Sequence, residues 1–281
     1  MTAPGPTSAP APAAAPGPTP HAAPTPVRSP LPESLAGATV VLVGGSSGIG
    51  LAAARLLAGL GARPVLVGRD ADRLAAAAAS VAAAARTAPG APPAPVRTYV
   101  SDVRDEERLG ALLDELGTVD HVLVSAGTAT RGAVTATTRE DVADSVEGRF
   151  WGAYAVARAA TPRLTAGGSI TYLSGVYVVR PVPNGAAVIA AAAAVEGLTR
   201  SLAVELAPRR IRVNAVRSGT ADTPMLRRRL PDDAAVADAG RAMPLGRYGT
   251  AEEVAAAALF LMANAYVTGT VLTVDGGQSL L

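Results

Sequence analysis

Residues 40–50 read Val40-Val41-Leu42-Val43-Gly44-Gly45-Ser46-Ser47-Gly48-Ile49-Gly50 and join an aliphatic run to a glycine-rich turn. The aliphatic run is typical of a strand that is buried on both faces of a sheet. The residues from Leu51 to Leu57 predict a helix directly after the turn. Glycine suits such a turn because a side chain would keep the backbone away from a phosphate, and a helix N-terminus offers N–H groups to an anion. Strand, glycines and helix in this order predict a dinucleotide site, with an unliganded glycine-rich turn as the alternative.

The composition narrows the class of protein. The chain has 281 residues, a net charge of +2 and no cysteine, and its basic residues other than histidine are all arginine. Disulfides, thiol chemistry and lysine chemistry are therefore excluded. The basic residues are scattered, which argues against a nucleic-acid partner. We find no apolar run long enough to span a bilayer, and we expect no membrane partner, no metal site and a cytoplasmic location.

The first 33 residues differ in composition from the rest. Residues 1–33 are rich in proline and alanine and offer almost nothing to bury. Such a segment cannot offset the entropy of ordering, so we expect a disordered tail, with a docking segment as the alternative. The tail lacks the charged start and apolar core of a secretory signal. We expect residues 34–281 to form a single dinucleotide-binding domain.

Strands and helices are expected to alternate through this domain. After the first strand, buried runs predict further strands at 64–67, 96–100, 122–127, 169–174, 211–216 and 271–275. Helices are expected between them, including a long one over 150–164, another over 187–206 and one starting near Ala251. A proline-rich loop over 88–95 is longer than such units need. This rhythm predicts an α/β fold with one doubly wound parallel sheet, Rossmann-like, and helices on both faces.

The motifs and their order resemble the short-chain dehydrogenase/reductase family over nearly everything after the tail. Besides the glycine turn, the matches include Val195-Glu196-Gly197-Leu198-Thr199-Arg200, Ile211-Arg212-Val213-Asn214-Ala215-Val216 and Val274-Asp275-Gly276-Gly277. The resemblance implies a bound nicotinamide dinucleotide, with an acid at the adenine and a threonine near the carboxamide or phosphate. The residues it assigns to the cofactor are Gly44, Ser46, Ser47, Gly48, Ile49, Gly50, Asp102, Val103, Ala126, Gly127 and Thr223.

The end of the second strand favours one cofactor over the other. An acid at this place binds the adenosine ribose of NAD and repels a 2′-phosphate. Here Gly68 fills the place and Arg69 follows. A guanidinium suits a phosphate by charge and by geometry, so we expect NADP(H) rather than NAD(H). The alternative is that Arg69 only pairs with Asp70 or Asp72.

The catalytic positions depart from the family pattern. The resemblance implies an asparagine, a serine, and a tyrosine with a lysine four residues later. Counting back from the match at 193–200 places Ala192 at the lysine and Val188 at the tyrosine. Gly175 then falls at the serine and Arg149 at the asparagine. All four are replaced, so the sequence predicts a divergent member of the family with unknown catalytic residues.

Three side chains are candidates to stand in for the lost ones: Tyr177, Arg149 and Ser174. Tyr177 follows the Gly175 position and could reach a carbonyl, but without a nearby cation its pKa should stay near ~10. Arg149 could stabilise an oxyanion but will not exchange a proton. Ser125 and Asn184 are further hydrogen-bonding candidates. The structural alternatives are packing for Tyr177 and a carboxylate partner for Arg149.

These observations leave three hypotheses. The first is an NADP(H)-dependent oxidoreductase that acts on a small carbonyl or alcohol with a non-standard proton relay. The second is a catalytically inactive sensor or partner subunit, a pseudoenzyme, and the third is a non-redox reaction on the same fold. Three arginines at 227–229, in a segment matching the family's substrate lid, hint at an anionic substrate, against a solvated charge run as the alternative. The resemblance of the helix after Ala187 and of the last strand implies a homodimer or homotetramer.

Overall fold

The computed structural model describes residues 33–85, 96–127 and 131–281. The predicted tail over 1–33 lies outside the described residues except for Glu33, and the predicted loop over 88–95 lies outside them entirely. Glu33 begins a short 3-10 helix, η1 (Glu33–Leu35), in which Leu35 is fully buried.

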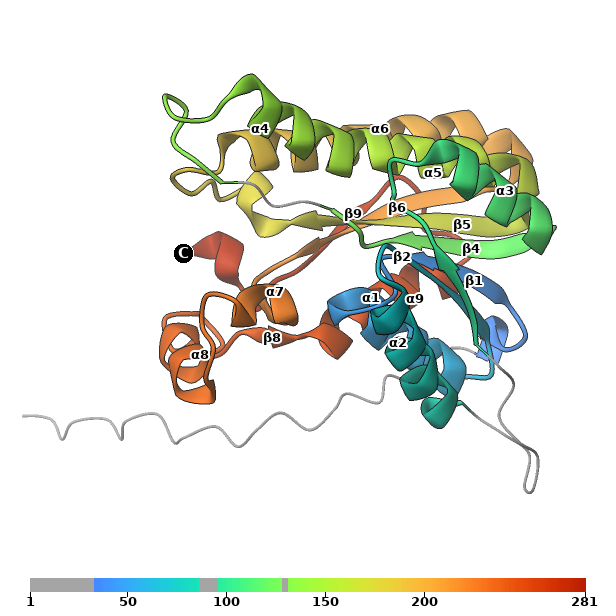
Figure 1. The fold of residues 1–281 in the computed structure, drawn as a ribbon, viewed down its shortest axis with the longest axis horizontal. Helices are drawn as coiled ribbons and strands as arrows, with labels where there is room; N and C mark the ends of the chain where they lie inside the picture. The colour runs from blue at the N-terminus through green and yellow to red at the C-terminus, as the bar shows by residue number, and fades with distance from the viewer. Residues whose placement is uncertain (1–32, 86–95, 128–130) are drawn as a thin grey trace, which may run out of the picture.

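A parallel sheet of seven strands forms the centre of the described structure (Figure 1). Its spatial order is β3-β2-β1-β4-β5-β6-β9. The strands are β1 (Thr39–Val43), β2 (Arg63–Gly68), β3 (Arg97–Val100), β4 (Val119–Val124), β5 (Leu164–Gly175), β6 (Arg212–Ser218) and β9 (Val271–Val274). The predicted Rossmann-like, doubly wound α/β fold is confirmed.

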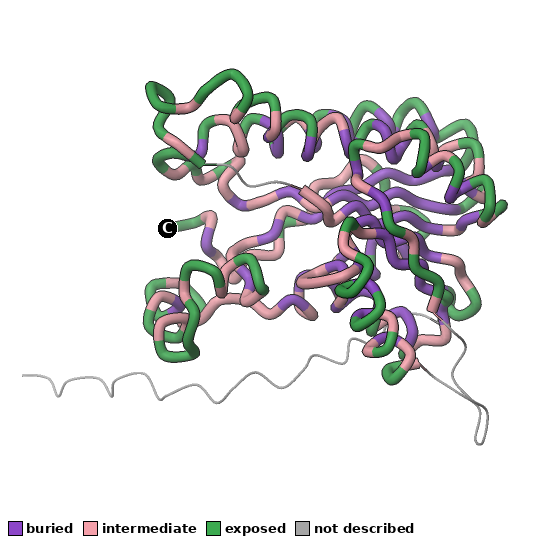
Figure 2. The backbone as a smooth tube through the Cα atoms, in the orientation of Figure 1, coloured by how far each residue is buried: buried purple, intermediate pink, exposed green. Residues whose placement is uncertain are grey.

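Helices cover both faces of the sheet, as Figures 1 and 2 show. One face is packed by α3 (Glu106–Leu116), α5 (Gly152–Ala160) and α6 (Ala186–Leu206). The other is packed by α1 (Gly48–Gly59), α2 (Ala71–Ala84) and α9 (Ala251–Ala263). The alternation of side chains along β1 explains the two layers, because Val41 and Val43 join the first core while Val40 and Leu42 join the second.

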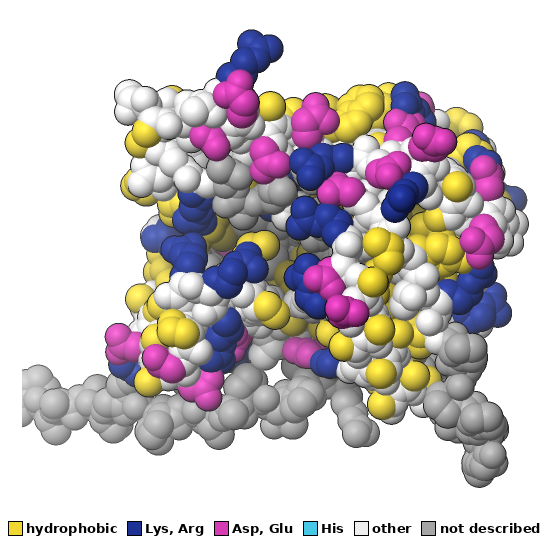
Figure 3. All heavy atoms as spheres, viewed as in Figure 1, with side chains coloured by type: hydrophobic (Ala, Val, Ile, Leu, Met, Phe, Trp, Pro, Cys, Tyr) yellow, Lys and Arg dark blue, Asp and Glu magenta, His cyan; other side chains and the backbone are white. Residues whose placement is uncertain are grey.

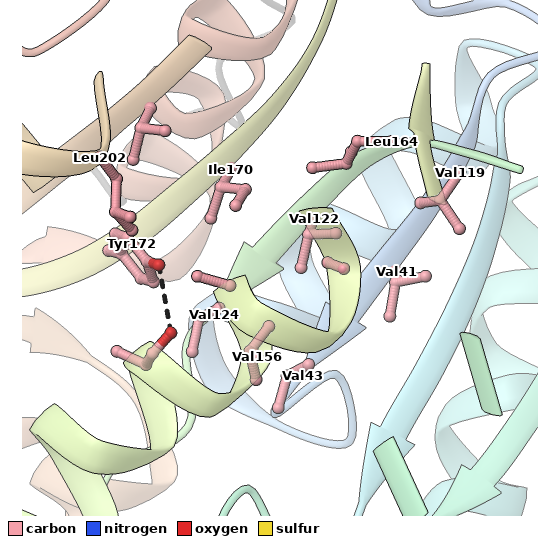
Figure 4. Packing of buried hydrophobic residues seen from close by; sticks show 14 of the residues in the cluster. Val41, Val43, Val119, Val122, Val124, Val156, Leu164, Ile170, Tyr172 and Leu202 are labelled. Carbon is pink, nitrogen blue, oxygen red and sulfur yellow. Dashed lines mark hydrogen bonds between the residues drawn. The ribbon is translucent and has the colours of Figure 1, made fainter. Parts of the chain in front are cut away.

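The larger core is drawn in Figure 4, where aliphatic side chains of β1, β4 and β5 meet those of α5 and α6. Tyr172 is 1 % exposed, and its hydroxyl donates a hydrogen bond to the carbonyl of Ala153 at 3.1 Å (Figure 4). Burial raises the pKa of this phenol. Tyr172 therefore joins β5 to α5 as a neutral hydrogen-bond donor, since a buried hydroxyl needs a partner.

The prediction of one helix over 150–164 is wrong at both ends. Helical structure begins at α4 (Arg139–Ser145), where the Thr138 and Asp141 side chains form a capping box. It continues through a π-helical turn, η2 (Val146–Trp151), into α5, which ends at Ala160. Thr161–Arg163, with a proline in its first turn, forms the short helix η3, and β5 starts at Leu164 rather than at Ser169. The cap residues and Pro162 set these boundaries, because both act locally on the backbone.

The helix α6 corrects another expectation. Together with the 3-10 turn η5 (Ala207–Arg209) it spans Ala186–Arg209 and is long and apolar enough to cross a membrane. The expectation that no apolar run in the sequence is long enough to span a bilayer is therefore wrong for this helix. Alanine, valine, isoleucine and leucine together make α6 apolar, and α6 packs one side on the sheet as the core helix of a globular fold does.

The strand order places a crevice at the carboxyl ends of the central strands. The chain runs outward from β1 through β2 to β3, and then returns to add β4 on the other side of β1. The connections after β1 and β4 therefore diverge at the carboxyl ends of these strands, which is where open α/β sheets bind ligands. Beyond the sheet, a small pair of strands, β7 (Ala221–Asp222) and β8 (Gly249–Thr250), brackets α7 (Pro224–Arg227) and α8 (Asp233–Gly240).

Candidate functional site

A cavity of about 390 Å³ lies at the carboxyl ends of β1, β2 and β4. Every residue that the sequence assigns to the cofactor lines it, namely Gly44, Ser46, Ser47, Gly48, Ile49, Gly50, Arg69, Asp102, Val103, Ala126, Gly127 and Thr223. The structure thus brings these residues together, and their role in cofactor binding stays a prediction. The three catalytic candidates, Tyr177, Arg149 and Ser174, do not line this cavity.

The glycine turn is packed so closely that it excludes side chains. Gly44 has φ +94°, and a Cβ there would lie 2.6 Å from the Ala126 nitrogen and 2.7 Å from Ser125 Oγ. A Cβ on Gly50 would collide with the carbonyl of Gly44. The Ser125 hydroxyl donates to the carbonyls of Val43 and Gly44, at 3.2 Å each. Ser125 therefore holds the turn against the end of β4, a different role from the substrate contact considered in the sequence.

The turn also leads into the start of α1. Ser47 is the N-cap and makes no side-chain cap hydrogen bond, and the helix begins at Gly48. The first-turn N–H groups and the positive end of the helix dipole therefore border the cavity. This arrangement fits the pyrophosphate of a dinucleotide.

An exposed arginine, Arg69, follows the glycine that ends β2. A Cβ on Gly68 would lie 3.2 Å from Ser46 Oγ, so any acid there would crowd Ser46. Arg69 is 63 % exposed and lies 3.7 Å from an Asp102 carboxylate oxygen. The expected alternative partner, Asp70, instead pairs with Arg73 at 3.0 Å and caps α2. A weakly held guanidinium beside a small residue fits a 2′-phosphate.

Asp102, the acid expected at the adenine, is held ionised by its neighbour Arg104. Arg104 donates from Nε to Asp102 Oδ1 at 3.1 Å and from Nη2 to Oδ2 at 3.2 Å. Its backbone N–H donates to the same carboxylate at 2.9 Å. Burial raises the pKa of Asp102, but these hydrogen bonds outweigh it and leave the pKa below its usual value. Asp102 thus presents acceptors to a donor such as an amino group.

Thr223 faces the glycine turn from the opposite wall. A Cβ on Gly48 would lie 3.6 Å from the Cβ and Cγ2 atoms of Thr223. Thr223 is the N-cap of α7, and this segment adds Pro224, Met225 and Arg228 to the cavity. The α7 segment therefore closes one side of the predicted cofactor site.

Tyr177 lies in a setting that the sequence analysis did not foresee. It belongs to the 3-10 turn η4 (Val176–Val178), which follows β5. The guanidinium carbon of Arg131 lies 5.0 Å from the centre of its ring. Burial raises the pKa of Tyr177, but hydrogen bonds with the side chains of Thr220 and Arg131 and the charges of Arg131 and Arg229 outweigh it, so the pKa is lowered. The condition stated for an ordinary pKa, the lack of a nearby cation, is not met, because Arg131 reaches the phenol from the connection after β4.

Arg149 lies in the π-helical turn η2, next to Gly148, a residue of the cavity wall. A Cβ on Gly127 would lie 3.2 Å from the guanidinium carbon of Arg149. Burial lowers the pKa of Arg149, although a guanidinium keeps its proton in proteins. The structure therefore places a buried cation behind the end of β4, and π turns of this kind are frequent at functional sites.

Ser174 is bonded to a buried ion pair. Its hydroxyl donates to Glu196 Oε1 at 2.8 Å, and Arg217 donates to both oxygens of Glu196, at 2.9 and 2.6 Å. The Glu196 side chain is 4 % exposed and that of Arg217 is 16 % exposed. Ser174 and Arg217 are register partners on β5 and β6, so their side chains point to the same face. Ser174 thus stabilises the α6 side of the sheet and is separate from the Tyr177 group.

Asn184 connects two loops near this end of the sheet. It adopts φ +62°, and its carbonyl accepts a hydrogen bond from the Gly132 N–H at 3.0 Å. The segment before α6 therefore touches the segment that carries Arg131. Here the Asn184 backbone makes the contact, whereas the sequence suggested a role for its side chain.

Several residues of the site were missed from the sequence. Arg73 and Arg104 line the cavity and were not singled out, whereas Arg228, which also lines it, was considered only as part of the run over 227–229. Arg104 follows Asp102 by two residues, so its proximity was a usable signal. Arg131 and Thr220 gave no local signal, because they reach Tyr177 from separate connections of the sheet.

Comparisons with known proteins agree with this architecture. A sequence model of the family described as Enoyl-(Acyl carrier protein) reductase matches residues 43–279. Carbonyl reductase family member 4 from Danio rerio is 36 % identical, over 86 % of this chain and 98 % of the relative. Galactitol 2-dehydrogenase from Cereibacter sphaeroides is 37 % identical, over 88 % of this chain and 96 % of the relative.

A solved structure is similar over the same region. The NADPH-bound structure of a short chain oxidoreductase from Pseudomonas aeruginosa PAO1, described as containing an atypical catalytic center, has a TM-score of 0.79 and 34 % identity. The match covers 85 % of this chain and 96 % of that one. The similarity therefore extends over most of the chain.

Proposed function

Because the chain belongs to the short-chain dehydrogenase/reductase family, we propose that it is an NADP(H)-dependent oxidoreductase that interconverts a carbonyl and an alcohol, with Tyr177 as the proton donor. The relatives described above are a carbonyl reductase and a dehydrogenase, which supports an oxidoreductase. The observation that carries the catalytic part is the position of Arg131 over the Tyr177 ring.

Carbonyl reduction needs a hydride at carbon and a proton at oxygen. A bound nicotinamide dinucleotide supplies the hydride. The Tyr177 hydroxyl supplies the proton, which leaves a phenolate beside the guanidinium of Arg131. Opposite charges this close stabilise the phenolate and lower the phenol's pKa towards neutral pH, which favours proton transfer. In the reverse direction the phenolate takes the proton from the alcohol, and solvent restores the starting state.

The preference for NADP(H) is supported by the residues at the carboxyl end of β2. Among the described residues Arg69 makes one long ion pair, with Asp102, and Gly68 leaves the room that an acid would fill. Ser46 Oγ faces the same space and offers a hydroxyl donor. A phosphate in that position would gain charge-assisted hydrogen bonds, whereas a bare ribose hydroxyl would not.

In this proposal Tyr177 replaces the family's tyrosine and lysine. The positions aligned with that pair, Val188 and Ala192, lie on α6 and carry no ionisable group. The serine position is Gly175 at the end of β5. The position aligned with the asparagine is Arg149, whose buried charge next to Gly127 strengthens the field for developing negative charge.

The test is a titration with NADPH and NADP⁺, followed by a turnover screen on reactive carbonyls. We expect NADPH to bind and to be consumed with at least one carbonyl substrate. If NADPH binds but nothing is reduced, the double change Val188→Tyr with Ala192→Lys reconstructs the family pair. Activity gained only by that double variant would contradict the role of Tyr177 and show a hydride site that lacks its relay. Inactivity of both proteins, with the cofactor bound, would indicate a non-catalytic binding protein.

A further inference from the structure

One arginine of the cavity at the glycine turn has no acid beside it. The arginines that line this cavity are Arg69, Arg73, Arg104 and Arg228. Arg73 pairs with Asp70 at 3.0 Å. Arg104 and Arg69 lie 3.1 and 3.7 Å from Asp102. Among the residues that the structure describes, no carboxylate oxygen lies within 4.0 Å of the Arg228 guanidinium. Arg228 therefore brings a positive charge to the cavity that no neighbouring acid offsets.

The residue before Arg228 shows the contrast. Arg227 donates to Asp222 from Nε at 2.6 Å and to Asp233 from Nη1 at 2.7 Å, and it does not line the cavity. These two carboxylates anchor α7 to β7 and to the start of α8. Arg228 continues the helical backbone by one residue, and successive helical residues point about 100° apart. Arg227 thus anchors the segment while Arg228 faces the cavity, so the interpretation of 227–229 as a solvated charge run is wrong for Arg227.

The wall that carries Arg228 faces the start of α1. A Cβ on Gly48, the first residue of α1, would lie 3.6 Å from the side chain of Thr223. The first-turn N–H groups and the helix dipole at this place attract an anion. An anion bound there lies between α1 and the wall formed by Thr223, Met225 and Arg228. Figure 3 shows basic side chains on both sides of the hollow on this face of the molecule.

We propose that Arg228 binds the pyrophosphate bridge of the dinucleotide, so that the bound cofactor joins α7 to the start of α1. A guanidinium suits a phosphate because it can donate paired hydrogen bonds to two of its oxygens. No ion pair with a carboxylate has to be broken first, since none holds Arg228 among the described residues. The inference deepens the proposed function and rests on it for the bound dinucleotide. It gives Arg228 a phosphate different from the 2′-phosphate expected at Arg69.

The test measures the dissociation constants of NADPH, NADH and ADP-ribose by calorimetry. All three carry the pyrophosphate bridge, only NADPH carries the 2′-phosphate, and ADP-ribose has no nicotinamide. Arg228→Gln should weaken all three by about 10-fold, because a charge-assisted hydrogen bond to their shared group is lost. Arg228→Lys keeps a positive charge without the paired donors, so it should recover part of the lost affinity.

Arg241→Gln is the control. It removes the same charge from the same connection between β7 and β8, at an exposed arginine that pairs with Asp238 and does not line the cavity. The three dissociation constants should be unchanged, because an exposed charge that does not contact the ligand is screened by water and salt.

The affinities separate this inference from the proposed function, because they are measured without turnover. If the ligands bind and Arg228→Gln weakens all three, the inference stands even where no carbonyl is reduced, a result that would sink the proposed function. If a carbonyl is reduced but Arg228→Gln binds all three ligands as the wild type does, the proposed function stands and the inference is overturned. A loss confined to NADPH would also overturn it, since Arg228 would then act on the 2′-phosphate. An equal loss in Arg241→Gln would overturn it too, by showing an effect of net charge alone.

Discussion

At the scale of single residues, Arg69 is the side chain that we propose to select NADP(H). Its contact with Asp102 is long and exposed, so little free energy is lost when the side chain turns to another partner. Asp102 keeps the firmer hydrogen bonds from Arg104 and does not depend on Arg69. Arg69 can therefore bind a phosphate without disturbing the acid on the adenine side.

Arg69→Ala should weaken NADPH binding by about 10- to 100-fold, because a charge-assisted hydrogen bond is lost. NADH lacks the phosphate and should bind almost as before. The measurement is a fluorescence titration of both cofactors against the wild-type protein. An equal loss for NADPH and NADH would show that Arg69 does not contact the 2′-phosphate.

Only part of the candidate site could be predicted from the sequence. The glycine turn was predictable because strand, turn and helix lie next to one another in the chain. Arg69 was predictable from its place at the end of a buried strand, and Asp102 from its match to the family motif. The cluster of Tyr177, Arg131 and Thr220 was not, since three connections of the sheet converge there and no local pattern marks them. The bond from Ser174 to Glu196 was hidden for the same reason.

At the scale of elements, β6 and α9 are joined by a buried arginine of β6, Arg212. Arg212 donates to the carbonyls of Leu261 and Met262 at the end of α9, at 2.5 and 2.6 Å. It satisfies carbonyls that a helix end leaves open, and its charge is favourable there. The charge also reaches His121 on β4, which lies buried with Nδ1 2.9 Å from Ser169 Oγ. Burial and then Arg212 lower the pKa of His121 from 6.5 to about 4.

This lowered pKa predicts a loss of stability in acid. The unfolded chain binds a proton near pH 6.5 and the folded protein only near pH 4, so the neutral histidine contributes stability above pH 6.5 that is lost as the pH falls to 4. The contribution at pH 7 is on the order of 3 kcal/mol. The free energy of unfolding in urea is measured against pH for the wild type and for His121→Asn. Between pH 7 and pH 4 the wild type should lose about this much more free energy of unfolding than the variant. Parallel curves would contradict a neutral, buried His121.

At the scale of the molecule, the sheet ends in an open edge at β9. In the described structure β9 pairs only with β6, and an unpaired edge invites another strand. Large apolar side chains are also exposed, including Val204 on α6, Phe260 on α9 and the C-terminal Leu280. The alanines of α6 allow close approach of a second helix. These surfaces are where we expect copies of the chain to meet.

We therefore predict a homodimer or homotetramer. Light scattering at micromolar concentration should give two or four times the chain mass of 27.9 kDa. Val204→Glu places a charge on a residue that is 78 % exposed, so the fold should survive while contact through α6 weakens. A monomeric mass for the wild-type protein would contradict the prediction.

The parallel order of the sheet followed from the alternation of buried runs with helices, whereas the boundaries near α4 and α5 did not. Thr138 and Asp141 start helical structure well before the apolar run at Phe150, and capping acts over single residues that a periodic pattern does not register. The π turn that carries Arg149 likewise depends on packing against α6 and α4 rather than on its own sequence.

The most direct test of the role of Tyr177 is the turnover of Tyr177→Phe with NADPH and a carbonyl compound that the wild-type protein reduces. The change removes only the hydroxyl, so the ring can still pack under Arg131. We expect kcat to fall by ~10²-fold or more while the NADPH affinity is unchanged, because a positioned general acid is lost. Tyr154→Phe, at a partly exposed tyrosine on α5, is the matched control and should leave kcat unchanged. Wild-type turnover in Tyr177→Phe would contradict the central claim that this phenol donates the proton.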